Sequence, residues 1–430
     1  MAVWNPKIEC AKRSEIEAIQ LERLKWSVQH AYDHVPMYHD KMVKAGVKPS
    51  DIRTLKDISK IPLTTKTELR EQYPFKLLAV PMREVVRIHA SSGTGQPITA
   101  GYTRRDLDTW AECIARIATA GGATADDIAQ VSFGYTLFTG AFGLHGGLEK
   151  IGCAIIPISS GNTERQINIM RDFGSTVLIA TPSYALYMAE VAERMDALKD
   201  IRLRVGLFGA EASTEEMRAE LERRYGILAT ENYGLTEVMG PGVSGECEYK
   251  CGMHINEDCF LAEIIDPDTG EVLPEGTQGE LVFTSITKQA FPLLRYRTRD
   301  ICILRHEDCP CGRTHIKMCK PMGRSDDMLI VKGVNVFPSQ IETVLLEQGY
   351  TSNYQIVVDR VNNSDTLDVL VEMTPEHFSD SLAEITQREK SLVAALKAML
   401  GIFAQVHLVS PKSIARSEGK AIRVIDKRRI

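Results

Sequence analysis

The chain has 430 residues, of which 44% are hydrophobic and 25% charged, and its net charge is -6 at pH 7. This composition is typical of a globular protein too long for one simple core, so two or more domains are expected. The acidic balance, with basic residues interspersed among acids, argues against nucleic acid as a partner. No signal-type segment or apolar run of membrane-spanning length occurs, which predicts a cytoplasmic protein without a membrane partner.

Apolar residues recur at helical spacing from Ser14 to about Ala45, which predicts a long amphipathic helix followed by a second one. Beyond them, short apolar strands alternate with helical segments; the strand sequences are VVRIHA, AQVSFGY, CAIIPIS, STVLIATP and RLRVGLFGAE. This alternation predicts an α/β fold with mainly parallel sheets covered by helices on both faces. Ligands of such sheets bind where loops leave the carboxyl ends of strands.

After Tyr233 the pattern changes to β-rich segments and turns, and we expect a β-rich subdomain at about residues 240–323. A new β/α pattern follows a polar, glycine-led segment that begins at Gly323 and has the character of a hinge. The predicted organisation is therefore a large N-terminal domain, residues 1–323, and a small mobile C-terminal α+β domain, residues 324–430.

A stretch rich in hydroxyl groups and glycine, Ser91 to Pro97, follows the first predicted strand. Its N–H and O–H groups could converge on a phosphate. A flexible turn explains the same composition. These residues alone leave both interpretations open.

Four segments in one order, SSGTGQPITAGYT, NYGLTE, LLRYRTRD and GRSDDMLIVKGVNVFPSQIE followed by SEGKAIRVIDKR, resemble motifs of the adenylate-forming acyl- and aryl-CoA synthetases. Further details such as WNPKIE, PISSGNTERQ and TPSYALYMAE are similar to the phenylacetate-CoA ligase branch. The resemblance implies two half-reactions. A carboxylate first attacks the α-phosphate of ATP to give an acyl-adenylate and pyrophosphate, and the thiol of coenzyme A then displaces AMP.

The resemblance also assigns residues to the first half-reaction. It implies that Lys420 and Thr236 stabilise charge on the α-phosphate and that Glu237 holds Mg²⁺. It implies further contacts to ATP or AMP from Ser91, Ser92, Gly93, Thr94, Gly209, Ala210, Glu211, Asn232, Tyr233, Gly234, Asp300 and Arg324. Structural alternatives are a helix-start acid at Glu237, a core tyrosine at Tyr233, and pairing of Asp300 with Arg297 or Arg299.

For the second half-reaction the resemblance implies a rotation of the small domain. Asp326 is the expected hinge, and Lys332, Gly333 and Val334 would then face the large domain and bind coenzyme A. Lys420 would reach the α-phosphate in one domain orientation and leave it in the other.

The stretch from Ser91 to Pro97 departs from the family pattern SSGTTGKP, because one residue and the lysine are missing. The polyphosphate therefore loses a nearby positive charge. We expect either weaker ATP affinity or help from another cation.

The ten cysteines include two groups with histidine, C-x3-C-x2-H-x4-C from Cys247 and C-x-C-x3-H-x3-C from Cys309. Thiolates and imidazoles suit tetrahedral zinc, although the spacings are not those of a standard CxxC pair, and buried thiols are the alternative. The family resemblance favours a structural Zn²⁺ on Cys247, His254, Cys309 and Cys311, with Cys251, Cys259 and His315 as further candidates.

The acid would bind near a segment rich in aromatic residues and glycine, and the candidates are Tyr135, Phe142 and Gly143. A core role is equally compatible with these aromatics. The resemblance implies phenylacetate, while another aryl or medium-chain acid stays open. Alternatives are transfer of the acyl group to a carrier-protein thiol or an amine, and a non-catalytic nucleotide-binding protein. A homodimer is implied only by the family.

Overall fold

The computed structural model describes residues 2–91, 96–211, 213–325, 329–331, 334–361, 364–374, 378, 382–416 and 423–428. Several predicted site residues lie outside this part of the chain, namely Ser92, Gly93, Thr94, Asp326, Lys332, Gly333 and Lys420. None of the described helices combines the length and hydropathy needed to cross a membrane.

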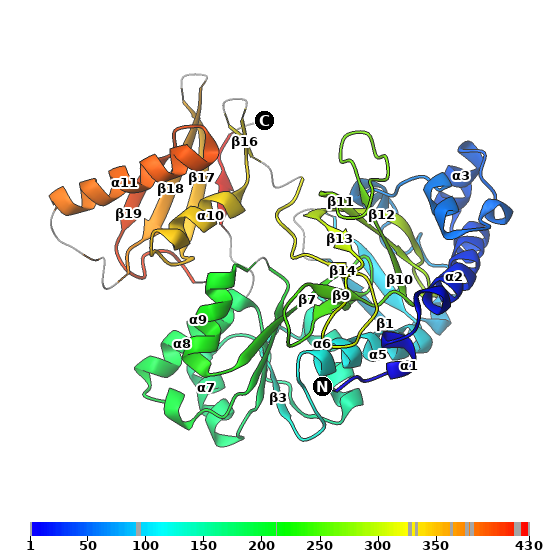
Figure 1. Ribbon diagram of the computed structural model, residues 1–430, viewed down its shortest axis with the longest axis horizontal. Helices are drawn as coiled ribbons and strands as arrows, with labels where there is room; N and C mark the ends of the chain where they lie inside the picture. Colours follow the sequence, from blue (N-terminus) through cyan, green and yellow to red (C-terminus); the bar gives the residue numbers. More distant parts are fainter. Residues whose placement is uncertain are drawn as a thin grey trace.

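The centre of the large body is a nine-stranded mixed sheet in the order β13-β14-β9-β8-β7-β6-β5-β3-β4 (Figure 1). Its parallel half consists of β3 (Ile128–Val131), β4 (Ala154–Ile156), β5 (Val177–Ala180), β6 (Val205–Gly209) and β7 (Leu228–Leu235). The antiparallel half consists of β8 (Gly240–Glu246), β9 (Met253–Ile255), β13 (Leu304–Arg305) and β14 (Lys317–Met318). The predicted parallel sheet is confirmed.

Helices cover both faces of this sheet, as β5 shows. Val177 and Ile179 belong to the apolar cluster that contains α5 (Arg104–Ala120) and α6 (Gly140–Ile151). Leu178 and Ala180, which point to the opposite face, belong to the cluster of three other helices. These helices are α7 (Thr163–Asp172), α8 (Pro182–Arg194) and α9 (Glu215–Tyr225).

The expectation that Ser91 follows a strand of the parallel sheet is wrong. The strand before it, β1 (Arg87–Ala90), pairs antiparallel with β2 (Thr99–Tyr102), and the two form a separate two-stranded sheet. The hydroxyl-rich stretch is therefore the connection of a hairpin. Its ends are joined by two hydrogen bonds, because Ser91 N donates to Ile98 O (2.9 Å) and Ile98 N donates to Ser91 Oγ (3.0 Å).

The β-rich segment after β7 contributes to two sheets. Four of its strands extend the nine-stranded sheet, and the others form a three-stranded antiparallel sheet of β10 (Phe260–Ile265), β11 (Gly279–Ser285) and β12 (Leu293–Cys302). The predicted N-terminal helices are α2 (Arg13–His34) and α3 (Pro36–Lys44), after the short α1 (Pro6–Glu9). Helix α2 is joined to β11 by a hydrogen bond from Ser27 Oγ to Ser285 O (2.9 Å).

The C-terminal part has a four-stranded sheet in the order β19-β18-β17-β20, with α10 and α11 packed against it (Figure 1). Its buried apolar residues form a cluster distinct from the large core. The elements are β15 (Leu329–Val331), β16 (Val334–Val336), α10 (Pro338–Glu347), β17 (Tyr354–Val361), β18 (Ser364–Glu372), α11 (Leu382–Leu400), β19 (Gln405–Val409) and β20 (Val424–Asp426). The domain boundary at residue 323 stays a prediction.

Candidate active site

The carboxyl ends of β6 and β7 bring two of the sequence motifs together. Gly209 at the end of β6 is opposite Asn232 in β7, and Asn232 Nδ2 donates to Phe208 O (2.8 Å). A Cβ on Gly209 would lie 2.5 Å from Asn232 O, and one on Gly234 would lie 1.8 Å from Gly240 O. Both glycines are therefore required by close backbone approach.

The loop after β6 continues with Ala210, whose φ of 71° is left-handed, and Glu211. Glu211 Oε1 accepts a hydrogen bond from Ser183 N (2.6 Å) at the start of α8. The Glu211 carboxylate is thus bound to a helix N-terminus, which favours negative charge. The expected contact of this loop with the base edge, through its backbone, stays a prediction.

Thr236 and Glu237 lie in the turn between β7 and β8. The Thr236 hydroxyl is 3.1 Å from that of Thr139, directly before α6. Glu237 is 8% exposed, and Lys66 Nζ lies 3.7 Å from its Oε1. The alternative of a helix-start acid at Glu237 does not apply, because no helix begins there.

Asp300 in β12 faces Tyr233 in β7. Tyr233 Oη donates to Asp300 Oδ2 at 2.5 Å, and Arg324 Nε lies 4.0 Å from Asp300 Oδ1. Burial, and then the negative charge of Asp300, raise the pKa of Tyr233, so the phenol stays neutral and donates. The alternative partners, Arg297 and Arg299, both pair with Glu280 instead.

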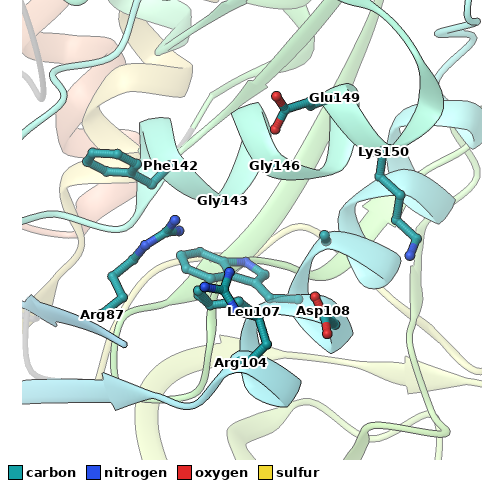
Figure 2. Close-up of a pocket in the computed structure, with 11 residues that line it drawn as sticks. Arg87, Arg104, Leu107, Asp108, Phe142, Gly143, Gly146, Glu149 and Lys150 are labelled. Carbon is teal, nitrogen blue, oxygen red and sulfur yellow. The ribbon is translucent and has the colours of Figure 1, made fainter. Parts of the chain in front are cut away.

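The acyl-pocket candidates lie around α6. The Tyr135 ring meets that of Phe142 edge to face at 5.2 Å, and Tyr135 Oη lies 2.9 Å from His145 Nδ1. Phe142 and Gly143 line a cavity of about 300 Å³ between α5 and α6 (Figure 2). Tyr135 is not part of its lining.

The lining of this cavity carries slightly more cations than acids, three against two. The Arg87 guanidinium lies 5.1 Å from the centre of the Phe142 ring, and Arg104 lies on the same side of the cavity (Figure 2). Burial, and to a lesser degree Arg104, lower the pKa of Arg87. Gly143 permits the tight packing of α5 against α6, because a Cβ there would lie 2.3 Å from Trp110.

The sequence analysis did not identify two lysines near the motif residues, because neither lysine belongs to a recognised motif. Lys66 is the first residue of α4 (Lys66–Glu71). Lys288 is fully buried, with its Nζ 3.3 Å from Val238 O and 4.9 Å from the centre of the Tyr102 ring. Burial lowers the pKa of Lys288 to about 8. The hydroxyl-rich and acidic motifs give no indication of either contact, because both depend on packing between distant segments.

The four favoured zinc ligands come together in the interior. The ligand atoms of Cys247, His254, Cys309 and Cys311 all lie within 4.8 Å of one another, and all four residues are buried. Cys247 Sγ is 3.6 Å from Cys309 Sγ, and Cys311 Sγ is 3.4 Å from His254 Nε2. These separations fit a tetrahedral ion with bonds of about 2.3 Å, whose ligands lie about 3.8 Å apart.

The further metal candidates are not part of this set. Cys251 Sγ lies 3.4 Å from Cys309 Sγ, but Cys251 is exposed. His315 Nε2 is instead hydrogen bonded to Ile8 O (3.1 Å), and Cys259 is buried in the large apolar core. These contacts exclude His315 and Cys259 from the four-residue cluster.

Comparisons with known proteins agree with this geometry. Family models for the AMP-binding enzyme and for the AMP-binding enzyme C-terminal domain match residues 94–287 and 333–428. Phenylacetate-coenzyme A ligases of Aromatoleum evansii and Escherichia coli K12 are each 48% identical over 98% of this chain, covering 96% and 97% of those proteins. The chain belongs to the phenylacetate-coenzyme A ligase family. It is an AMP-forming acid–thiol ligase.

A solved structure of 2-hydroxyisobutyryl-CoA ligase with 2-HIB-AMP, in the postadenylation state, superimposes on this ligase with a TM-score of 0.92. That protein is 29% identical, and the match covers 99% of this ligase and 92% of that chain. The same enzyme in the thioesterification state, with 2-HIB-AMP and CoA, gives a TM-score of 0.72. Over its whole length, this ligase is therefore closer to the postadenylation arrangement.

Proposed function

We propose that this ligase activates phenylacetate with ATP and transfers the acyl group to coenzyme A. The proposed position of the nucleotide rests on the Asp300 carboxylate. This carboxylate contacts Tyr233, three residues before Thr236, and lies near Arg324. A carboxylate has two oxygens and can accept hydrogen bonds from both ribose hydroxyls. The names of the similar ligases favour an arylacetic acid, and the Phe142 ring, which lines the cavity and packs edge to face on Tyr135, is compatible with an aromatic substrate.

In the first half-reaction the acid attacks the α-phosphate between Thr236 and Lys420. The Thr236 hydroxyl donates a hydrogen bond to a phosphate oxygen, and the Lys420 ammonium neutralises charge that builds in the transition state. The buried Glu237 carboxylate is a hard oxygen ligand and would hold Mg²⁺, which neutralises phosphate charge when bound. Asp300 and the loop from Gly209 to Glu211 orient the adenosine.

In the second half-reaction the small domain rotates about Asp326. Lys420 then leaves, and Lys332, Gly333 and Val334 approach the large domain and contact the pantetheine arm. The two TM-scores against 2-hydroxyisobutyryl-CoA ligase support two arrangements of this kind, since that enzyme matches well in one state and less well in the other.

The Cys/His cluster, defined as Cys247, His254, Cys309 and Cys311, is proposed to hold a structural Zn²⁺. All four residues are buried, which suits a closed site and leaves no open position for a substrate. The cluster joins β8 and β9 to the loop between β13 and β14. Its role would be to fix the antiparallel edge of the large sheet.

A screen of carboxylic acids for pyrophosphate release, with and without coenzyme A, tests the proposed function. Phenylacetate is expected to give the highest rate, and coenzyme A should be needed for rapid release of AMP. Pyrophosphate release without a response to free coenzyme A would indicate a carrier-protein or amine acceptor. Absence of release with every acid would indicate a non-catalytic nucleotide-binding protein.

A further inference from the structure

Lys66 lies beside the proposed magnesium ligand and has no role in the reaction described above. Its Nζ is 3.7 Å from Glu237 Oε1, and its side chain is 30% exposed, against 6% for Glu237. The Lys66 side chain is therefore more accessible to solvent than the carboxylate beside it. Lys66 thus lies where a ligand entering from solvent toward Glu237 would meet it.

The backbone before Lys66 is fixed against β12, the strand that carries Asp300. Thr64 N donates to Arg295 O (2.8 Å), and Arg297 N donates to Thr64 O (2.9 Å). Thr65 caps the helix, because its Oγ1 accepts from Glu68 N (3.3 Å). The base of the Lys66 side chain is thereby held in place, while its long stem leaves the ammonium free to move by a few ångströms.

The stretch Ser91 to Pro97 contains no cation, although a polyphosphate carries several negative charges. Glu237 would hold Mg²⁺ together with phosphate oxygens, which would bring those oxygens close to this carboxylate. A phosphate oxygen on the same ion as Glu237 would therefore lie within reach of an ammonium that is 3.7 Å from that carboxylate.

The other described cations near these residues have different contacts. Lys288 is fully buried, with its Nζ 3.3 Å from Val238 O. Arg324 lies at the Asp300 end of the site, where the ribose is proposed to bind. Lys41 pairs with Glu68 at 2.7 Å and donates to Leu63 O. Lys66 is the cation whose ion pair with Glu237 the described part of the chain records.

We propose that Lys66 binds the β- and γ-phosphates of ATP and supplies the positive charge that the stretch Ser91 to Pro97 lacks. This inference rests on the proposed position of ATP at Thr236 and Glu237. Glu237 would hold Mg²⁺, and the Lys66 ammonium would then contact phosphate oxygens in place of this carboxylate. The gain is a charge-assisted interaction with the leaving pyrophosphate.

The first test is Lys66→Met, which keeps the length and removes the charge. We expect the KM for ATP in phenylacetate-dependent pyrophosphate release to rise about tenfold or more, with the KM for phenylacetate within about twofold of wild type. Thioester formation from supplied acyl-adenylate should be unchanged, and Lys66→Arg should retain part of the ATP affinity. The matched control is Lys60→Met, an exposed lysine paired with Asp57, which should leave all these values unchanged.

The second test restores SSGTTGKP by inserting a threonine after Thr94 and replacing Gln96 with lysine. In the Lys66→Met background this change should lower the KM for ATP toward that of wild type, while in wild type it should have a much smaller effect. A double-mutant cycle then measures the coupling. Equal effects in both backgrounds, or a Lys66→Met KM for ATP within twofold of wild type, would overturn the proposal.

Calorimetric titration with a non-hydrolysable ATP analogue and Mg²⁺ distinguishes failure of the Lys66 proposal from failure of the proposed function. Weaker binding to Lys66→Met than to wild type supports the Lys66 contact even where the acid substrate has been chosen wrongly. Equal binding to both proteins rejects the Lys66 contact, whereas a wild type that releases no pyrophosphate with any acid rejects the proposed function.

Discussion

The nucleotide site includes β7 and the turn that follows it, and the Cys/His cluster lies at β8 and β9 of the same sheet, but the polar groups of the two regions are satisfied in different ways. In the nucleotide site, Asp300 pairs with Tyr233, and Glu237 pairs with Lys66. These partners can be exchanged when a substrate arrives. In the cluster, four buried ligand atoms lie within 4.8 Å of one another, and a single cation could bind all four. We therefore expect the nucleotide site to change its interaction partners during the reaction and the Cys/His cluster to keep its contacts.

The largest effect is expected at Lys420, the cation that is proposed to enter the nucleotide site from the small domain. Lys420→Ala should slow adenylation about 10²- to 10³-fold or more, the scale of losing one preorganised donor. Thioester formation from supplied acyl-adenylate should survive, because Lys420 is proposed to leave the site before that step. Pyrophosphate release and single-turnover thioester assays measure the two steps. An equal loss in both would contradict a role confined to the first step.

A substitution in the Cys/His cluster should lower the stability of the protein rather than its catalytic rate. Cys311→Ser should bind no zinc and lower the free energy of unfolding by about 3 kcal/mol, because the remaining buried ligands are left unpaired. Activity well below the melting temperature should change little. Cys251→Ser, the exposed thiol 3.4 Å from Cys309, is the control and should retain both zinc and stability.

Metal analysis and thermal melts check this prediction. Purified wild type should contain about one equivalent of zinc, and a strong chelator should lower its melting temperature to near that of Cys311→Ser. Well under one equivalent, or a melting temperature that does not respond to the chelator, would leave the cluster as four buried side chains without a metal.

A smaller effect is expected at the partner of Asp300. Tyr233→Phe keeps the ring and removes the hydroxyl that donates to Asp300 at 2.5 Å. If the hydroxyl only positions the carboxylate, the KM for ATP should rise about threefold to tenfold, with the KM for phenylacetate unchanged. Asp300→Asn should cost more, because it replaces an acceptor oxygen of the ribose site. A larger effect of Tyr233→Phe than of Asp300→Asn would reverse these roles.

The sequence predicted the parallel sheet because each strand is a short apolar run followed by a helical segment, as with β5 and α8. The four Cys/His residues that the family resemblance favours among seven candidates also lie together, whereas their spacings alone left the choice open. The sequence did not predict the position of strands that pair with segments lacking a recognisable sequence pattern. The hairpin of β1 and β2 is one case, because four-residue strands carry no sign of which sheet they join.

The contacts of single charged residues were the other part that could not be predicted. Lys66 reaches Glu237 across 171 positions, and Arg297 pairs with Glu280 rather than with Asp300. Such contacts depend on the register of β12 against its neighbours. Register is set by packing of the whole sheet, which no local window of sequence contains.

Lys288 differs from both regions, because it is a buried cation for which the described residues provide no carboxylate in contact. Burial lowers its pKa from 10.5 to about 8. Between these values the unfolded chain binds more protons than the folded one, so the free energy of unfolding rises with pH. From about pH 7.5 to 9.5 this rise should be about 2 kcal/mol, and Lys288→Met should lack it. Urea unfolding of both proteins at the two pH values measures the difference. Lys60→Met is the control, and a rise in Lys288→Met as large as in wild type would show that Lys288 titrates normally.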